Sequence, residues 1–232
     1  MDDTPLSIRI VLLTVLAASV AAIAFKIGVG PALLPLPGAK SLVAEAVVLF
    51  AIYACVVAWP SQKRILRPLF AARIGAIGCL VQIAHVATER FCSLPSRWDA
   101  ATSLIAMLAT FLLWGYVAFR AGRAGSRLFA SVWYATWSAI VTMTFAMYAG
   151  IMLELYLAPY PLEPMRQWAE FQRSGWSDLA AFSIANTIDS ASSHLLLGPV
   201  VAAIVGSIAF ALSRPGNRHL KTTSLYTPRL GP

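Results

Sequence analysis

Long apolar stretches recur six times along the chain, separated by short polar or proline-containing segments. They cover residues 8–25, 41–59, 69–89, 99–119, 128–157 and 194–213. A helix of about 20 apolar residues crosses the roughly 30 Å hydrocarbon core of a bilayer. Because backbone groups in lipid must be satisfied within their own segment, each stretch is expected to be helical. The pattern predicts an all-α integral membrane protein, a bundle of about six transmembrane helices.

The segment before the last stretch differs from the others. Residues 165–193 mix charged side chains with Trp168 and Trp176, a composition typical of chain that lies in the membrane interface. Its second half, Ser177 to Ser193, is too polar to face lipid, so a polar half-helix or interfacial helix is expected before the last span. We therefore predict a single transmembrane domain over residues 1–213 and a polar tail over residues 214–232.

Composition and charge agree with a membrane protein. Hydrophobic residues make up 59% and charged residues 12% of the chain, where a soluble domain has roughly 25% charged residues. The net charge of +8 does not indicate nucleic-acid binding, because the basic residues form no recognised motif and do not cluster with stacking aromatics. With the amino terminus inside, 12 of the 18 Lys and Arg residues fall on the cytoplasmic side. The positive-inside rule then predicts a multi-pass protein of the cell (inner) membrane with both termini cytoplasmic.

Ionisable side chains gather at the outer ends of the predicted spans. Gln82, His85 and Glu89 are spaced by three and four residues, which places them on one face of a helix, and Arg90 follows. Near the other end of the chain, a second polar group has a spacing of four residues: Asn186, Ser190 and His194. Asp189 and Ser193 lie beside them on the same broad helical face. Because ionisable groups at membrane depth are costly, we expect these residues, with Glu45 and Glu154, to form an outward-facing pocket between the second, third and fifth spans and the segment before the sixth.

Several kinds of chemistry are compatible with this pocket. A divalent metal is one, with His85, Glu89, Asp189 and His194 as candidate ligands, although no complete motif such as HExxH is present. A haem held by His85 and His194 is less favoured, because both would have to be axial ligands in a chain with few histidines. Hydrolysis by Asp189, Ser190 and His194 is disfavoured, because residues so close on one helix cannot adopt the geometry of a triad.

The preferred interpretation is a membrane protein that binds or conducts a small solute, a proton or an ion from the outer side. Glu89 and Asp189 would carry charge, and His85 and His194 would change protonation. A membrane-embedded metal enzyme or redox subunit stays open, as does an accessory subunit whose polar groups only join helices. The lipid bilayer is the predicted partner, and the sequence also leaves open a homo-oligomer or a partner membrane subunit.

Overall fold

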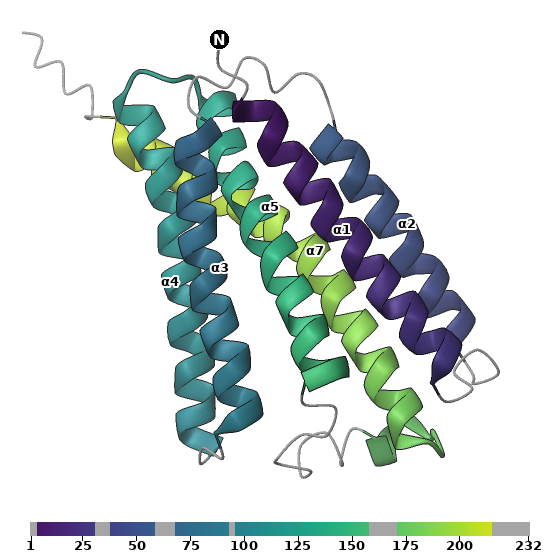
Figure 1. The fold of residues 1–232 in the computed structure, drawn as a ribbon. Helices are drawn as coiled ribbons and strands as arrows, with labels where there is room; N and C mark the ends of the chain where they lie inside the picture. Colours follow the sequence, from purple (N-terminus) through teal and green to yellow (C-terminus); the bar gives the residue numbers. More distant parts are fainter. Residues whose placement is uncertain (1–3, 31–37, 59–67, 93–95, 158–170, 215–232) are drawn as a thin grey trace, which may run out of the picture.

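A computed structural model describes residues 4–30, 38–58, 68–92, 96–157 and 171–214, and within these ranges it contains helices and no strand (Figure 1). The elements are α1 (Thr4–Val29), α2 (Ala39–Ala58), α3 (Pro68–Phe91), α4 (Ser96–Arg123), α5 (Leu128–Met152), the π-helical turn η2 (Leu153–Leu157) and α7 (Leu179–Ser213). Six helices in these ranges are long and apolar enough to cross a membrane. The predicted all-α membrane bundle is confirmed.

The bundle is arranged around α5 and α7. The antiparallel pair α3 and α4 lies on one side of these two helices, and the pair α1 and α2 lies on the other (Figure 1). α5 contacts α1, α3, α4 and α7, which makes it the central helix. The start of α1, the turn between α4 and α5 and the end of α7 all lie at one end of the bundle (Figure 1). We call this the N-terminal end, and the opposite end is the predicted outer end.

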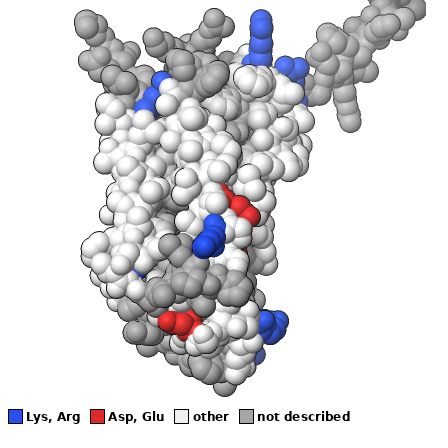
Figure 2. Space-filling view, turned by 90° about the vertical axis from the view of Figure 1, so that its right-hand side faces the viewer, with Lys and Arg blue, Asp and Glu red and all other residues white. Residues whose placement is uncertain are grey.

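Large apolar side chains cover the outside of the bundle. Leu112, Phe129 and Leu212 are between 73% and 81% exposed, and many other aliphatic side chains face outward with them. On the face formed by α1 and α2, most of the described surface is uncharged and is drawn white, with few charged residues (Figure 2). Water would disfavour such a surface, whereas lipid tails match it. The chain is therefore a polytopic membrane protein.

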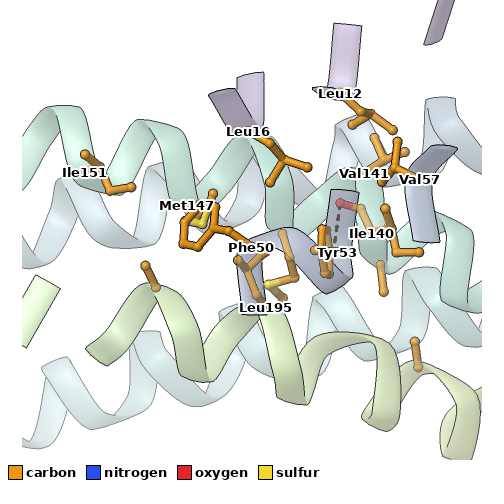
Figure 3. Close-up of a cluster of buried hydrophobic side chains, with 14 of the residues drawn as sticks. Leu12, Leu16, Phe50, Tyr53, Val57, Ile140, Val141, Met147, Ile151 and Leu195 are labelled. Atoms are coloured by element: carbon orange, nitrogen blue, oxygen red, sulfur yellow. Dashed lines mark hydrogen bonds between the residues drawn. The ribbon is translucent and has the colours of Figure 1, made fainter. Parts of the chain in front are cut away.

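The core joins α5 to the helices on both sides. Figure 3 shows side chains from α1, α2, α5 and α7 meeting in one cluster. Leu12 and Leu16 come from α1, and Phe50 and Tyr53 come from α2. The Tyr53 hydroxyl donates to the backbone oxygen of Ile140 on α5 at 3.4 Å. This contact satisfies the one polar atom of the Tyr53 side chain inside an otherwise apolar layer.

Small residues bring α3 against α5. A Cβ added at Gly75 would lie 2.6 Å from the backbone oxygen of Ser138, so the two backbones touch at this point. The Thr142 hydroxyl lies 3.0 Å from the Gly75 oxygen and 2.9 Å from the Ser138 oxygen, and it accepts from Trp114 Nε1 of α4 at 3.3 Å. The repeat of Ala71, Gly75 and Cys79 predicts close helix packing, and burial of all three confirms it.

Helix α7 is longer than a single membrane crossing. Its 35 residues span roughly 52 Å at about 1.5 Å per residue. Residues 179–193, which were predicted to form a polar half-helix or interfacial helix, are helical and continue into the last span without a break. Asp178 caps the start, because its side chain accepts from the backbone N–H groups of Ala180 and Ala181. The polar part of α7 thus stands on the same rigid element as the span.

We expect Gly75→Ala to lower the stability of the protein by about 1–3 kcal/mol, because the added methyl group would force α3 and α5 apart. Gly28→Ala is the matched control, since a Cβ there meets nothing within 4 Å. Thermal unfolding in detergent measures both. Equal melting temperatures for the two variants would contradict the close contact between α3 and α5.

Candidate functional site

A small cavity lies between α3, α5 with η2, and α7, in the half of the bundle away from the N-terminal end. Its volume is about 70 Å³. A water molecule needs at least about 10–15 Å³ of such space, so a few waters fit. Its lining residues are Gln82, Val86, Met143, Ala146, Met147, Gly150, Ile151, Glu154, Thr187, Ser190, Ala191 and His194. Four of the residues predicted for the pocket, Gln82, Glu154, Ser190 and His194, thus line one cavity.

Glu154 reaches the cavity from a local irregularity of the fifth span. The span changes from α- to π-helical at Leu153, whose N–H points to the backbone oxygens of both Ala149 and Gly150. A π-helical turn is rare, and such turns are frequent at functional sites. Glu154 is the second residue of this turn, and its side chain is half-buried. The irregular turn therefore carries the one carboxylate among the lining residues that the structure describes.

A short hydrogen bond connects Glu154 to α7. The Thr187 hydroxyl lies 2.8 Å from Glu154 Oε2 and 2.9 Å from the backbone oxygen of Ser183. A hydroxyl has one hydrogen to donate and lone pairs with which to accept. It therefore donates to Glu154 when the carboxylate is ionised. When the carboxyl is protonated, Thr187 accepts from it and turns its own hydrogen to Ser183.

His194 faces the same cavity with a defined tautomer. Its Nδ1 lies 2.7 Å from the backbone oxygen of Ser190 and 3.5 Å from the Ser190 hydroxyl. A carbonyl oxygen only accepts, so Nδ1 carries a hydrogen and Nε2 is the nitrogen that takes up or releases a proton. The side chain of His194 is exposed at the edge of the cavity. An imidazole is thus placed between the cavity and its surroundings.

Gln82 connects the cavity to α4. Its Nε2 donates to the Thr110 hydroxyl at 2.8 Å, and that hydroxyl donates to the backbone oxygen of Ala106. The amide of Gln82 is therefore held in place from outside the cavity, which positions it on the α3 side of the lining. Apolar Val86 lies one turn further along α3.

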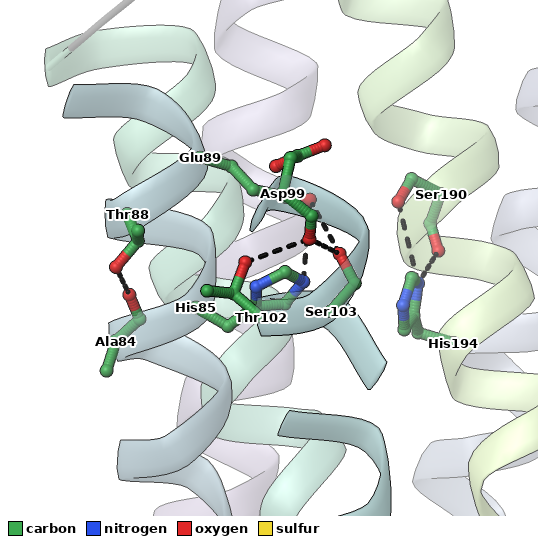
Figure 4. A network of polar contacts seen from close by, with 9 residues as sticks. All are labelled: Ala84, His85, Thr88, Glu89, Asp99, Thr102, Ser103, Ser190 and His194. Carbon is green, nitrogen blue, oxygen red and sulfur yellow. Dashed lines mark hydrogen bonds and ion pairs between the residues drawn. The ribbon is translucent and has the colours of Figure 1, made fainter. Parts of the chain in front are cut away.

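His85 and Glu89 belong to a different polar cluster, between α3 and α4 (Figure 4). His85 Nε2 lies 3.5 Å from Glu89 Oε1, and the Ser103 hydroxyl of α4 lies 3.5 Å from the same oxygen. The Thr102 and Ser103 hydroxyls donate to the backbone oxygen of Asp99. His85 Nδ1 is buried without a hydrogen-bond partner in the described part of the chain. This cluster does not contribute to the cavity lining.

The remaining predicted site residues lie away from the cavity. The side chains of Glu45 and Asp189 are exposed, and that of Asn186 is half-buried outside the lining. Arg90 is the penultimate residue of α3, and its side chain lies outside the described part of the structure. Within the described ranges, no three His, Cys, Asp or Glu residues form a group that could hold a metal ion.

The sequence prediction included Glu154 but not Thr187 or the apolar part of the α5 lining. Thr187, Ser190 and His194 follow the helical spacing of three and four residues, and so do Met143, Met147 and Glu154 with the smaller residues between them. Met143 and Met147 are buried. The signal for the apolar part is the helical face of Met143, Met147 and Gly150, which leads to the predicted Glu154.

Comparisons with known proteins do not assign the chain to a family. No family model matches it, and no curated protein or solved structure matches it either. The residues that line the cavity are therefore the basis for inferring a function.

The cavity should be accessible to water. In a protein whose native cysteines are replaced by alanine, Ser190→Cys should react with a small water-soluble methanethiosulfonate much faster than Ser138→Cys. Both are serines in helices, but Ser190 lines the cavity and Ser138 is fully buried between α3 and α5. Mass spectrometry of the labelled protein gives the two rates. Equal rates would mean that the cavity is closed to water.

Thr187→Val should destabilise the protein by about 0.6 kcal/mol, the average for a hydrogen bond between membrane helices. The substitution keeps the shape of the side chain but removes the hydroxyl that contacts Glu154. Thr187→Ser retains the hydroxyl and is the control, with unfolding in denaturant as the measurement. The hydrogen bond would be unimportant if valine and serine variants unfolded alike.

Proposed function

We propose that this membrane protein takes up a proton at Glu154, from the outer side of the membrane, through the cavity between α3, α5 and α7. The observation that carries the proposal is the Thr187 hydroxyl between two acceptors, 2.8 Å from Glu154 Oε2 and 2.9 Å from the Ser183 oxygen. This arrangement supplies Glu154 with a hydrogen bond in either protonation state. A purely structural contact would need a hydrogen bond in only one protonation state of Glu154.

The size of the cavity favours a very small ligand. Pockets for drug-sized molecules measure about 300–1,000 Å³, whereas this cavity measures about 70 Å³. A few water molecules would fill that volume, which both Glu154 and His194 line. Protons move along such chains of water and titratable groups.

The charge of the lining favours a positive ligand. Among the described lining residues, Glu154 is acidic, His194 is titratable, and none is Lys or Arg. The other polar groups are an amide and hydroxyls, which suit water. An anion would meet no fixed positive charge here, whereas a proton neutralises the carboxylate and lowers the cost of placing it in the membrane.

His194 is the second group of the proposed pathway. Its Nδ1 donates to the backbone oxygen of Ser190, 2.7 Å away, which leaves Nε2 as the site of protonation. His194 lies seven residues, or about 10 Å, nearer the N-terminal end than Thr187, the partner of Glu154 on α7. A proton that enters from the outer side would therefore reach Glu154 first, and the imidazole would be the next group on the pathway.

Infrared spectroscopy of the protein in lipid bilayers tests this proposal. A pH titration should show one protonated carboxyl group in an apolar environment, and this signal should be absent from Glu154→Gln. Glu45→Gln makes the same chemical change at an exposed carboxylate and should leave the signal in place. The proposal fails if Glu154→Gln keeps the full signal.

An accessory role is the second candidate, and the inter-helix hydrogen bonds favour it. Gln82 with Thr110 and Thr187 with Glu154 each join two elements of the bundle. An accessory protein would show a loss of stability in Glu154→Gln without a titrating carboxyl signal in the native protein. Proton flux into dye-filled vesicles then separates conduction from binding alone.

A further inference from the structure

A second and larger cavity lies at the N-terminal end of the bundle, between α3, α4 and the start of α5. Its volume is about 500 Å³. Phe70 comes from α3, Tyr134 comes from α5, and most of the remaining lining comes from α4 and the turn that follows it. That remaining part consists of Val117, Arg120, Ala121, Ala124 and Ser126. It is distinct from the cavity around Glu154 and shares no residue with it.

Among the described lining residues, Arg120 is the charged one, and aromatic rings hold it in place. Its guanidinium carbon lies 5.6 Å from the ring centre of Phe70 and 6.0 Å from that of Tyr116. Its Nη1 donates to the Tyr116 hydroxyl at 3.1 Å. In the described part of the chain, no carboxylate lies within ion-pair distance of Arg120. The guanidinium is thus oriented by uncharged groups and keeps donors for an anion.

The surroundings of the cavity reinforce its positive potential. The start of α5 lies beside it, and its first turn contains no acidic residue. Arg127 occupies the N-cap position and makes no side-chain hydrogen bond to the helix. A helix start attracts negative charge. Arg123, at the end of α4, and Arg127, before α5, add two exposed basic side chains beside the connection between these helices.

The other lining residues are mostly apolar. Val117 is buried about one turn before Arg120, toward the membrane-spanning part of α4, and Phe70 of α3 packs beside the guanidinium. Ala121 and Ala124 add apolar surface on the other side of Arg120. Arg120 lies three residues before the end of α4, where a long span meets the headgroup region. The cavity therefore combines a cation near the end of the span with apolar surface around it, of which Val117 lies on the membrane side.

We propose that this cavity binds an anionic phospholipid, with the headgroup phosphate on Arg120 and an acyl chain along Val117 and Phe70. A guanidinium suits phosphate because it offers two parallel donors. Basic pockets between membrane helices on the cytoplasmic side are suited to anionic headgroups. The volume of about 500 Å³ exceeds what a phosphate ion fills and suits a headgroup with part of a chain.

Native mass spectrometry of the full-length protein in detergent tests this site. Phosphatidylglycerol is titrated against phosphatidylcholine, with the native protein, Arg120→Gln and Arg123→Gln compared. Arg123 is the matched control, since it carries the same charge on the same helix without lining the cavity. We expect Arg120→Gln to weaken phosphatidylglycerol binding by about fivefold or more, and Arg123→Gln to have a much smaller effect.

A second variant keeps the test valid if Arg120→Gln is poorly folded. Ala124→Trp fills the cavity without removing a charge, and it should also weaken phosphatidylglycerol binding. Equal weakening by Arg120→Gln and Arg123→Gln would mean that only the general charge of this end matters, and would overturn the proposal. Equal affinity for phosphatidylcholine, or displacement of the lipid by millimolar inorganic phosphate, would overturn it as well.

Discussion

The close contact of α5 with α3 and α7 is the constraint on which the rest of the structure depends. Lipid tails are as apolar as leucine, so helices in a bilayer associate mainly through tight packing and hydrogen bonds. Gly75 of α3 touches the backbone of α5 at Ser138, and Gly206 of α7 packs against α5 so closely that an added Cβ would lie 2.9 Å from the Cβ of Ala135. The Thr142 hydroxyl adds a hydrogen bond within the first of these contacts. These contacts hold three helices together in the half nearer the N-terminal end.

The cavity follows from where this packing ends. Beyond Gly75 and Gly78, α3 presents Gln82 and Val86 to α5 and α7, and these larger side chains leave space between the helices. The polar groups that face the space are held from outside or from their own helix, as Gln82 is by Thr110 and His194 is by Ser190. Glu154 completes the lining from the π-helical turn. The tightly packed half near the N-terminal end thus supports a polar half near the predicted outer end. In that polar half we propose that Glu154 is protonated.

Much of the fold was predictable, because the length of each apolar stretch is set by the thickness of a bilayer. The convergence of particular side chains was not. An α-helix turns by about 100° per residue, so on α7 Asp189 points roughly opposite to Thr187, while Ser190 and His194 lie near it. Likewise, His85 lies about 60° from Gln82 around α3, which is enough to direct it to α4 instead of the cavity. The spacing of polar residues identified the right helices, but the packing partners of each face decided which residues meet.

A crystal structure of the protein grown in a lipid mesophase would show directly whether Glu154 lines a water-filled site. We expect Glu154 and Thr187 to be in hydrogen-bond contact beside a cavity between α3, α5 and α7, with ordered water in the space toward His194. A structure in which Glu154 points to lipid, or in which α3 and α7 leave no shared space beside α5, would contradict it.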